Sequence, residues 1–401
     1  MKIAHVISTF PPRHGGMGQV CFEEAKRLAE RGHDVTVFTL AYDRLQTTDY
    51  GLQFSDLGPA LSADRLRTAN CELKIVRLKP LFMFGDAGFA PQLFFKLKNF
   101  DLVHLHYPFY GAAQCVWLAK FFRGQKYVVT YHMDAHPVGF LKKLFQGIYD
   151  FVWAKKVLSG AEKVAVVDED FFNASRHGRF VKKEKAVFLP NGVDLEIFKP
   201  RPKDLSAVGL PELAGKKIIL FVGNLLPLKR LDLAIEALKI LSGLQTTDYG
   251  SGIGGGHSLA LVVVGGGYAE EKFKKMAVGA NVVFAGSCPG VQKLAAYYNA
   301  ADCLVAPSDF ESFSLAALYG LASGLPIIAS DIPGLRRRVA DGQDGFLFKA
   351  GSAESLALAL KKLFALTDEE RKKMGEAGRA KAAAYSWNVH IEKLLEVYSG
   401  V

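Results

Sequence analysis

Two adjacent cations, Lys229 and Arg230, separate a strand-like apolar run from a helical pattern in FVGNLLPLKRLDLAIEALKIL. Two cations at a loop-to-helix junction can neutralise a diphosphate through charge-assisted hydrogen bonds to its oxygens. A solvated basic loop without a ligand is the alternative interpretation. The spacing therefore favours a phosphate site here and leaves the plain loop open.

A second candidate site lies in VAPSDFESFSLAALYGLASGLP, where a strand-like run leads through a polar turn with Glu311 into a helix. We expect that helix to start near Phe313. The backbone amides of Phe313, Ser314 and Leu315 would then point out of the helix N-terminus towards a phosphate. An acidic residue in this place can also be a cap that complements the helix dipole.

Glycines precede the first helical pattern, which runs over residues 18–31. Gly15, Gly16 and Gly18 would let a phosphate or sugar oxygen approach the helix N-terminus closely, although a plain tight turn explains them too. A dinucleotide fingerprint fits poorly, because Cys21 stands where a small residue is needed. The following strand, VTVFTL, also ends without an acid for the ribose.

Three histidines stand near the ends of strand-like runs. DLVHLHYP places His104 and His106 two residues apart, on one side of a strand, and TYHMDAH places His132 at the end of the next strand. Binding sites of α/β sheets form at the carboxyl ends of the strands. The alternative for each histidine is a buried side chain that a backbone carbonyl satisfies.

The elements that must position these residues alternate between strands and helices, which is typical of an α/β fold with parallel sheets. Strands are expected over residues 2–8, 34–39, 101–106 and 127–132, and again over 217–222, 260–264, 281–285, 302–306 and 326–329. A proline-bearing linker over 198–210 separates the two sets. We therefore expect two doubly wound domains, at residues 1–200 and 201–385.

The composition supports this organisation. The chain has 401 residues, half of them apolar, and a net charge of +10 that favours anionic partners but includes no dense basic block of the nucleic-acid type. Its five cysteines lack CxxC spacing, which predicts a reducing, cytoplasmic location without disulfides or a zinc site. Pro11 and Pro12 end the first apolar run, so we expect a strand there and no signal peptide. No apolar stretch approaches the roughly 20 residues of a membrane span.

Several motifs together resemble the retaining glycosyltransferases of the GT-B fold, group 1 and family 4, which include sucrose and glycogen synthases and lipopolysaccharide and phosphoinositol mannosyltransferases. The motifs are GGMGQV with RGHDVTVFT, DLVHLHYP, TYHMD, PNGVDLEIFKP, FVGNLLPLK, VVVGGG, FAGSCP, the Glu311 segment and DGQDGFLF. The resemblance spans nearly the whole chain. It implies two Rossmann-like domains facing across a cleft, the first for the acceptor and the second for the donor, with a last helix over 386–401 that crosses back.

The resemblance also implies roles for residues of the first domain. Gly16 would abut the donor phosphates or the acceptor, and His132 would lie near the transferred sugar as a catalytic residue. Gly15 and His106 would belong to the acceptor side.

In the second domain, the resemblance implies that Lys229 holds the diphosphate leaving group and that Glu311 accepts hydrogen bonds from sugar hydroxyls. The amides from Phe313 to Leu315 would help to bind phosphate.

The chain departs from the family pattern at four positions. Asn224 stands where the family usually has Arg, and Arg230, where Gly is common, could supply the missing charge. Tyr319 replaces the second Glu of the family's acidic pair, which normally grips the nucleotide ribose. Arg337 also stands where Glu is frequent. These donor-site departures could mean a different donor or a weakened enzyme.

The implied mechanism is a front-face attack in which the leaving diphosphate helps to take the acceptor proton. We expect no metal requirement and no cofactor: the substrates would be a UDP-, GDP- or ADP-sugar and a carbohydrate or lipid-linked acceptor. An acidic triplet begins at Asp168, whose expected role is a helix N-cap. A non-catalytic sugar-nucleotide-binding protein and a nucleotide-sugar epimerase on the same fold remain alternatives.

The stretch PVGFLKKLFQGIYDFVWAKKVLSGAEK mixes lysine pairs and aromatic residues at roughly helical spacing. It could form a helix at an anionic membrane surface, on the inner face, that serves a lipid-linked acceptor. An ordinary amphipathic helix of the first domain is the alternative.

The heptapeptide LQTTDYG occurs twice, at residues 45–51 and 244–250. Both copies fall between expected elements, and we interpret them as insertions in surface loops, which tolerate added length.

Overall fold

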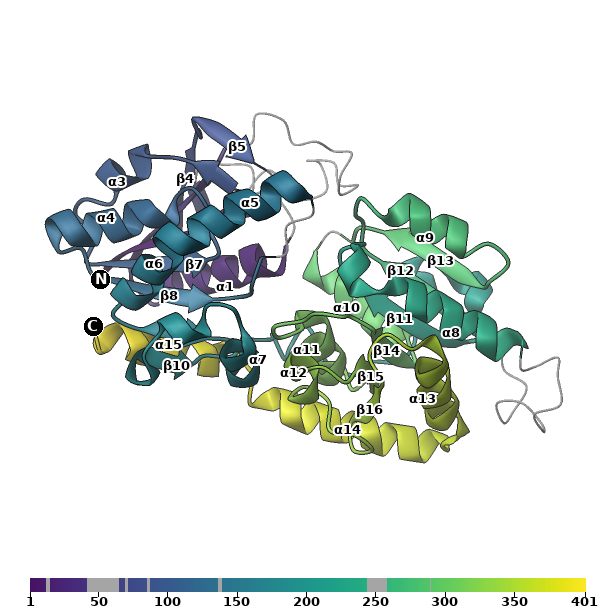
Figure 1. Cartoon of the computed structure of the whole chain (residues 1–401). Coiled ribbons are helices and arrows are strands. Elements are labelled where there is room, and N and C mark those ends of the chain that lie inside the picture. The colour runs from purple at the N-terminus through teal and green to yellow at the C-terminus, as the bar shows by residue number, and fades with distance from the viewer. Residues whose placement is uncertain are drawn as a thin grey trace. The chain divides into compact units, whose positions relative to one another are not determined.

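The structure is a computed structural model that describes residues 1–11, 15–41, 65–68, 71–84, 87–135, 139–243, 258–288 and 290–401. Both LQTTDYG copies lie outside these residues. The chain divides into two compact units (Figure 1). The first unit ends at Gly192 and also contains residues from Trp387 to Val401, while the second runs from Val193 to Ser386.

The first unit is built on a sheet whose strand order is β10-β9-β8-β7-β1-β2-β4-β3. All neighbours pair in parallel except β3 and β4. The strands are β1 (Lys2–Val6), β2 (Asp34–Leu40), β3 (Arg65–Thr68), β4 (Cys71–Leu78), β7 (Leu102–Tyr107), β8 (Tyr127–Tyr131), β9 (Val164–Val166) and β10 (Ala186–Phe188). A small hairpin adds β5 (Phe82–Phe84) and β6 (Ala87–Phe89).

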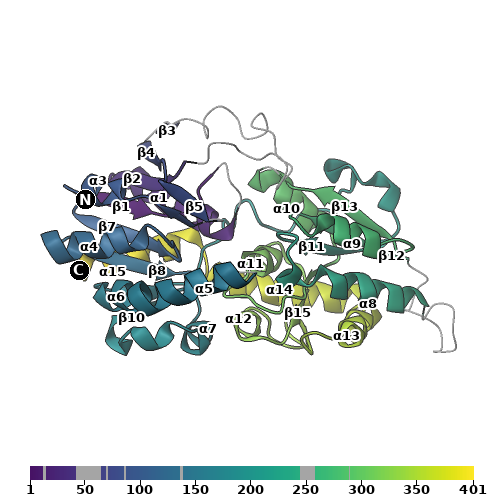
Figure 2. The same ribbon diagram turned by 45° about the horizontal axis from the view of Figure 1, so that its top comes forward.

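Helices connect and cover this sheet (Figures 1 and 2). They are α1 (Gly16–Glu30), α3 (Gln92–Lys96), α4 (Ala113–Arg123), α5 (Phe140–Tyr149), the π-helical segment η2 (Asp150–Ala154), α6 (Lys155–Gly160) and α7 (Glu169–Ala174). The side chain of Asp168 accepts a hydrogen bond from the amide of Phe171 at 2.9 Å, so the predicted N-cap is confirmed.

The last helix, α15 (Trp387–Ser399), belongs to the first unit although it follows the second unit in the sequence. Its buried residues Ile391, Leu394 and Val397 join the same hydrophobic core as β1 and α1. The ring of Trp387 packs directly against the backbone of Gly192. A Cβ at position 192 would lie 2.4 Å from that ring, so only glycine fits there. The closing helix is thereby fixed to the end of the first unit's own chain segment.

The second unit has an entirely parallel sheet in the order β13-β12-β11-β14-β15-β16. Its strands are β11 (Lys217–Val222), β12 (Leu259–Val264), β13 (Val282–Gly286), β14 (Cys303–Ala306), β15 (Ile327–Ser330) and β16 (Gly345–Phe348). The helices are α8 (Leu231–Gly243), α9 (Glu270–Met276), α10 (Val291–Ala300), α11 (Leu315–Ala322), α12 (Pro333–Arg336), α13 (Ala353–Ala365) and α14 (Asp368–Ala383).

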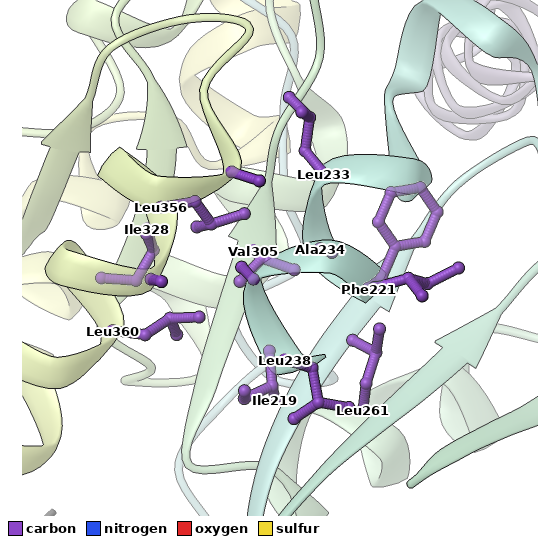
Figure 3. Close-up of a cluster of buried hydrophobic side chains, with 14 of the residues drawn as sticks. Ile219, Phe221, Leu233, Ala234, Leu238, Leu261, Val305, Ile328, Leu356 and Leu360 are labelled. Atoms are coloured by element: carbon purple, nitrogen blue, oxygen red, sulfur yellow. The ribbon is translucent and has the colours of Figure 1, made fainter. Parts of the chain in front are cut away.

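The core of the second unit explains why the sequences of its strands are continuous apolar runs. Side chains of β11, β12, β14 and β15 meet those of α8 and α13 in one buried cluster (Figure 3). Its labelled members include Ile219, Leu261 and Ile328 from the sheet and Leu238 and Leu360 from the helices. Strands of a parallel sheet are covered on both faces, so they carry little polar alternation. The predicted α/β class with two parallel sheets is confirmed.

Candidate active site

Lys229 and Glu311 form an ion pair at the carboxyl edge of the second unit's sheet. Lys229 ends the 3-10 helix η7 (Pro227–Lys229), which follows β11, and its Nζ contacts Oε2 of Glu311 in the loop after β14. The side chains keep 25% and 15% of their surface exposed, so a ligand can reach both. The amide of Asp309 donates to the carbonyl of Leu228 at 2.9 Å and ties the two loops together.

Arg230 lies beside this pair but is already engaged by two carboxylates. Its backbone is left-handed, with a φ of 51°. Its Nε donates to both carboxylate oxygens of Asp232, and its Nη1 donates to those of Asp309 at 2.9 and 3.1 Å. Burial alone would lower the pKa of Arg230, but these carboxylates raise it. The guanidinium therefore stays charged, and its charge is largely compensated within the unit.

The N-terminus of α11 stands directly after Glu311. The helix starts at Leu315 rather than Phe313, because Ser314 is the N-cap: its φ is 63° and its Oγ accepts a hydrogen bond from the amide of Ala317 at 3.3 Å. The first amides of a helix have no intrahelical acceptor. Within the described part of the chain, the amides of Phe313 and Leu315 donate no hydrogen bond, so this terminus can take an anion.

The side chain of Phe313 contributes packing to this site. It is only 2% exposed, and the guanidinium of Arg338 lies 3.9 Å above its ring centroid. Nε of Arg338 also donates to the carbonyl of Phe313 at 3.2 Å. Phe313 can therefore offer a ligand its backbone amide only.

Gly334 positions the Glu311 loop, a role that the sequence interpretation missed. It lies in α12, and a Cβ at this position would meet the carbonyl oxygen of Glu311 at 1.9 Å. Any side chain would therefore push the Glu311 loop away. The signal was present as Pro-Gly after a strand-like run, but only the tertiary structure shows which backbone it touches.

The loop that holds Asn224 packs against a second glycine-rich loop. Gly265 has a φ of 140°, and a Cβ there would lie 2.0 Å from the carbonyl oxygen of Gly223. The amide of Leu225 donates to the carbonyl of Gly266 at 2.9 Å. The motif VVVGGG thus fixes the start of the loop that carries Asn224 towards Lys229.

Tyr319 packs towards the interior of the second unit. The residue is 8% exposed, and its ring stacks on that of Phe198 with a centroid distance of 4.2 Å and an interplanar angle of 10°. Tyr298 contacts it edge-on at 6.4 Å. The ring of Tyr319 therefore serves as a core element of α11, where the family has a second acid.

In the first unit, Gly15 is the N-cap residue of α1 and Gly16 its first residue. The first turn approaches the strand-end loop closely, since a Cβ on Gly18 would lie 2.9 Å from the carbonyl oxygen of Thr9. The predicted helix N-terminus is thus present, and the residues just before Gly15 lie outside the described part.

The histidines of the first unit form a buried chain. Nδ1 of His106 lies 2.9 Å from Nε2 of His132, and Nε2 of His106 lies 3.0 Å from Nδ1 of His5. Burial lowers the pKa of His132 and of His5 to about 3, so both rings are neutral at pH 7. His106 is fully buried and His132 is 5% exposed. Of this pair, only His132 at the end of β8 retains any exposed surface.

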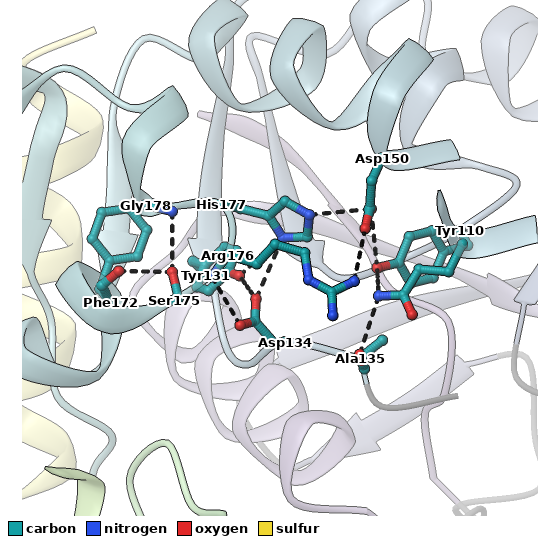
Figure 4. A network of polar contacts seen from close by, with 11 residues as sticks. Tyr110, Tyr131, Asp134, Ala135, Asp150, Phe172, Ser175, Arg176, His177 and Gly178 are labelled. Carbon is teal, nitrogen blue, oxygen red and sulfur yellow. Dashed lines mark hydrogen bonds and ion pairs between the residues drawn. The ribbon is translucent and has the colours of Figure 1, made fainter. Parts of the chain in front are cut away.

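A polar network beside β8, which sequence reasoning also missed, centres on His177 (Figure 4). Its Nδ1 lies 3.4 Å from Oδ1 of Asp134, and its Nε2 lies 3.1 Å from Oδ1 of Asp150. The hydroxyl of Tyr131 donates to Asp134, and the amide of Arg176 donates to it at 3.1 Å. Burial would raise the pKa of Asp134, but these donors and His177 lower it to about 2. The network therefore anchors the TYHMD turn that carries His132.

Comparisons with known proteins place the chain in a family. The family model for glycosyl transferases group 1 matches residues 206–381, and the model for glycosyltransferase family 4 matches residues 14–197. D-inositol 3-phosphate glycosyltransferase of Thermobispora bispora is 30% identical over 409 residues, covering 96% of this chain and 90% of that protein. The enzyme of the same name from Thermomonospora curvata is 29% identical over 418 residues, with 96% and 90% covered.

Solved structures agree on the fold. Sucrose-phosphate synthase from Thermosynechococcus elongatus has a TM-score of 0.74 at 22% identity, with 99% of this chain and 98% of that one covered. HepE of Anabaena, solved with UDP and glucose, has a TM-score of 0.73 at 16% identity and full coverage of both chains. These likenesses establish the GT-B fold. The family models and the relatives show that the chain belongs to the group 1 glycosyltransferases, enzymes that transfer a sugar from a nucleotide sugar.

Proposed function

We propose that this enzyme transfers a hexose from a nucleoside diphosphate sugar to a hydroxyl acceptor with retention of anomeric configuration. The observation that supports it most is the Lys229–Glu311 ion pair next to the N-terminus of α11. It combines a cation, a carboxylate and free helix amides within one strand-end loop system. The cation and the helix amides can bind a leaving diphosphate, and the carboxylate can accept hydrogen bonds from sugar hydroxyls.

Lys229 can serve Glu311 and the donor together. An ammonium group has three donors, and the contact with Glu311 uses one of them. The remaining two can face the diphosphate. As the bond between the anomeric carbon and the phosphate oxygen breaks, negative charge grows on that oxygen, and Lys229 with the α11 amides stabilises it.

A front-face reaction accounts for retention. A double displacement would require a carboxylate placed to attack the anomeric carbon. Glu311 is ion-paired with Lys229, which favours its use as a holder of sugar hydroxyls over its use as a nucleophile. In the proposed step, the acceptor oxygen bonds to the anomeric carbon from the side that the diphosphate leaves. The acceptor proton passes to the leaving phosphate oxygen, so atoms and charge balance.

We further propose that the acceptor is lipid-linked and that the first unit docks on an anionic membrane. Large apolar side chains stand exposed along α5 and η2: Phe140 (78%), Leu141 (70%), Leu144 (50%), Ile148 (58%) and Phe151 (90%). Their spacing puts them on neighbouring helical turns. The exposed Lys142, Lys143, Lys155 and Lys156 supply the charge that anionic headgroups attract. No helix in the described part of the chain is long and apolar enough to cross a bilayer.

The transfer itself is proposed to need neither metal nor cofactor, and to take place in the cytoplasm at the inner membrane face. UDP-, GDP- and ADP-hexoses are the donor candidates. The relatives are named for inositol 3-phosphate, which makes phosphorylated polyols the first soluble acceptors to test beside lipid-linked sugars.

The test is a matrix of these donors and acceptors in which proton NMR reads the product. We expect one donor class to give a product whose anomeric configuration equals that of the donor, at a rate that added Mg²⁺ or Mn²⁺ does not raise. An inverted product would refute retention. Donor binding without transfer would favour a binding protein, and donor conversion without an acceptor would favour an epimerase.

A further inference from the structure

The core of the first unit contains four potential metal ligands that no step of sugar transfer uses. His5 comes from β1, Glu24 from α1, and His104 and His106 from β7. All four side chains are completely buried. Each residue offers one ligand atom, which is Nδ1 or Nε2 of a histidine or a carboxylate oxygen of Glu24. These four atoms all lie within 4.8 Å of one another.

Four of the six distances between these atoms are close to those of a tetrahedral site. Oε2 of Glu24 lies 3.5 Å from Nδ1 of His104, 3.7 Å from Nε2 of His106 and 3.9 Å from Nδ1 of His5. Nδ1 of His5 lies 3.0 Å from Nε2 of His106. Four ligands at 2.0–2.1 Å from Zn²⁺ would stand about 3.3 Å apart. Small movements would therefore place all four at bonding distance from one ion.

The carboxylate of Glu24 gives the strongest sign that the cluster lacks a component. Within the described residues, its Oε2 is buried and has no hydrogen-bond partner. A buried polar atom without a partner is costly, more so when it can carry charge. This oxygen is aimed at three imidazole rings, and an ion between them would satisfy it.

Most of the atoms that would face away from the ion already have partners. Nε2 of His104 lies 2.7 Å from the hydroxyl of Thr130, and Nδ1 of His106 lies 2.9 Å from His132. Oε1 of Glu24 lies 3.0 Å from Nε2 of His390 on α15. Hydrogen bonds of this kind orient metal ligands in proteins. Nε2 of His5 is the exception and has none among the described residues.

Metal binding would replace three contacts that the cluster makes now. These are the hydrogen bond between His5 and His106, the 2.7 Å contact between Nδ1 of His104 and the hydroxyl of Tyr398, and the 3.9 Å contact between Nδ1 of His5 and Sγ of Cys21. In exchange, four ligands from three elements would share one ion. Three imidazoles and a carboxylate form a set that suits Zn²⁺ in particular.

We propose that His5, Glu24, His104 and His106 bind one divalent transition-metal ion, best matched by Zn²⁺, as a closed structural site. The site uses residues of the first unit only and goes beyond the proposed transfer reaction, in which the ion takes no part. It would join β1, β7 and α1, and through His390 also α15. This proposal departs from the sequence expectation of no zinc site, because the ligands are not adjacent in the sequence.

The full-length protein is produced in zinc-rich and in zinc-depleted medium, and bound metal is measured by mass spectrometry after gel filtration. We expect about one Zn²⁺ per chain from the rich medium and a higher melting temperature than for the depleted protein. Protein grown with Co²⁺ should show the visible absorption bands of tetrahedral Co²⁺. Glu24→Gln should lose the metal, whereas His33→Gln, a change at a histidine outside the cluster, should keep it.

The proposal would be overturned if the wild-type protein from both media contained zinc only at the background level of the measurement and had identical melting temperatures. The cluster would then be a hydrogen-bonded network only. Should Glu24→Gln fail to fold, Thr130→Val tests the same site, because loss of the contact to His104 should weaken metal retention by about 10- to 100-fold. Lys229→Met should lose transfer and keep the metal, so failure of the metal site and failure of the proposed function are distinguishable.

Discussion

The ring of Tyr319 stacks on that of Phe198, with centroids 4.2 Å apart and planes 10° from parallel. This contact joins α11, whose N-terminus faces the proposed phosphate site, to the segment by which the chain enters the second unit. Both residues are buried. The stack gives position 319 a structural role in supporting the helix that carries Ser314 and Leu315.

A double-mutant cycle with Phe198→Leu and Tyr319→Leu measures this role. We expect each single change to lower the free energy of unfolding, and the pair to show a coupling energy of about 0.5–1.5 kcal/mol, as for other aromatic pairs. Phe221→Leu, in the same unit but outside the stack, serves as the control and should combine additively with Tyr319→Leu. Additive losses for Phe198 and Tyr319 would show that the stack contributes no specific energy.

The network around His177 predicts a pH dependence of stability. Burial alone would lower the pKa of His177, but its contacts with Asp134 and Asp150 raise it. A raised pKa in the folded state contributes stability that is fully present below the unfolded pKa of about 6.5 and is lost as pH rises through the folded pKa. Tyr131 and Arg176 also face this network.

Wild-type protein and His177→Gln are compared by urea denaturation between pH 5.5 and pH 9. These limits lie about 1 unit below and about 2.5 units above the unfolded pKa of histidine. The wild-type advantage should be largest at the acidic end and should shrink as pH rises. An advantage that stays constant or grows with pH would contradict the charged pairing of His177.

Arg230 should matter less for transfer than Lys229. Its charge is compensated by Asp232 and Asp309, while Lys229 has a single carboxylate partner among the described residues. Removal of a principal charge-stabilising donor typically lowers kcat by about 10²–10³, which is the loss we expect for Lys229→Met. The kcat of Arg230→Gln should stay at least about tenfold above that of Lys229→Met. Steady-state kinetics with the identified donor measures this. An equal or larger loss for Arg230→Gln would move the main phosphate contact to Arg230.

Membrane docking predicts a specific sensitivity of vesicle binding. Full burial of a phenylalanine side chain contributes about 1.5–3 kcal/mol, so Phe140→Ser with Phe151→Ser should weaken binding to phosphatidylglycerol vesicles by 10²-fold or more. Leu358→Ser removes a side chain of comparable exposure (66%) from the second unit and should leave binding unchanged. Flotation assays at low salt measure both. Absence of wild-type binding to these vesicles would remove the membrane proposal.

Much of the fold could be predicted from sequence, because local patterns determine the strands of a covered parallel sheet. The strand expected over residues 217–222 matches β11, and the expected N-cap at Asp168 is present. Lys229 and Glu311 were both identified as site candidates from their places after strand-like runs, but their ion pair was not predicted.

Contacts between distant segments could not be predicted in this way. The inward packing of Tyr319 depends on Phe198, and the approach of Gly334 to Glu311 depends on how two loops meet. The partners of His177 come from separate elements. Periodicity and motif spacing carry no information on such pairs, since burial and shape decide them only after the elements pack.

The most direct test of the central claim compares Lys229→Met with Lys203→Met. Both lysines form ion pairs with a carboxylate in the second unit, Lys229 with Glu311 and Lys203 with Asp302 at 2.7 Å. Single-turnover transfer from the identified nucleotide sugar is measured for each, together with the melting temperature. We predict that Lys229→Met loses about 10²–10³ in rate with folding retained, and that Lys203→Met stays close to wild type. Wild-type turnover in folded Lys229→Met would contradict the assignment of this site to sugar transfer.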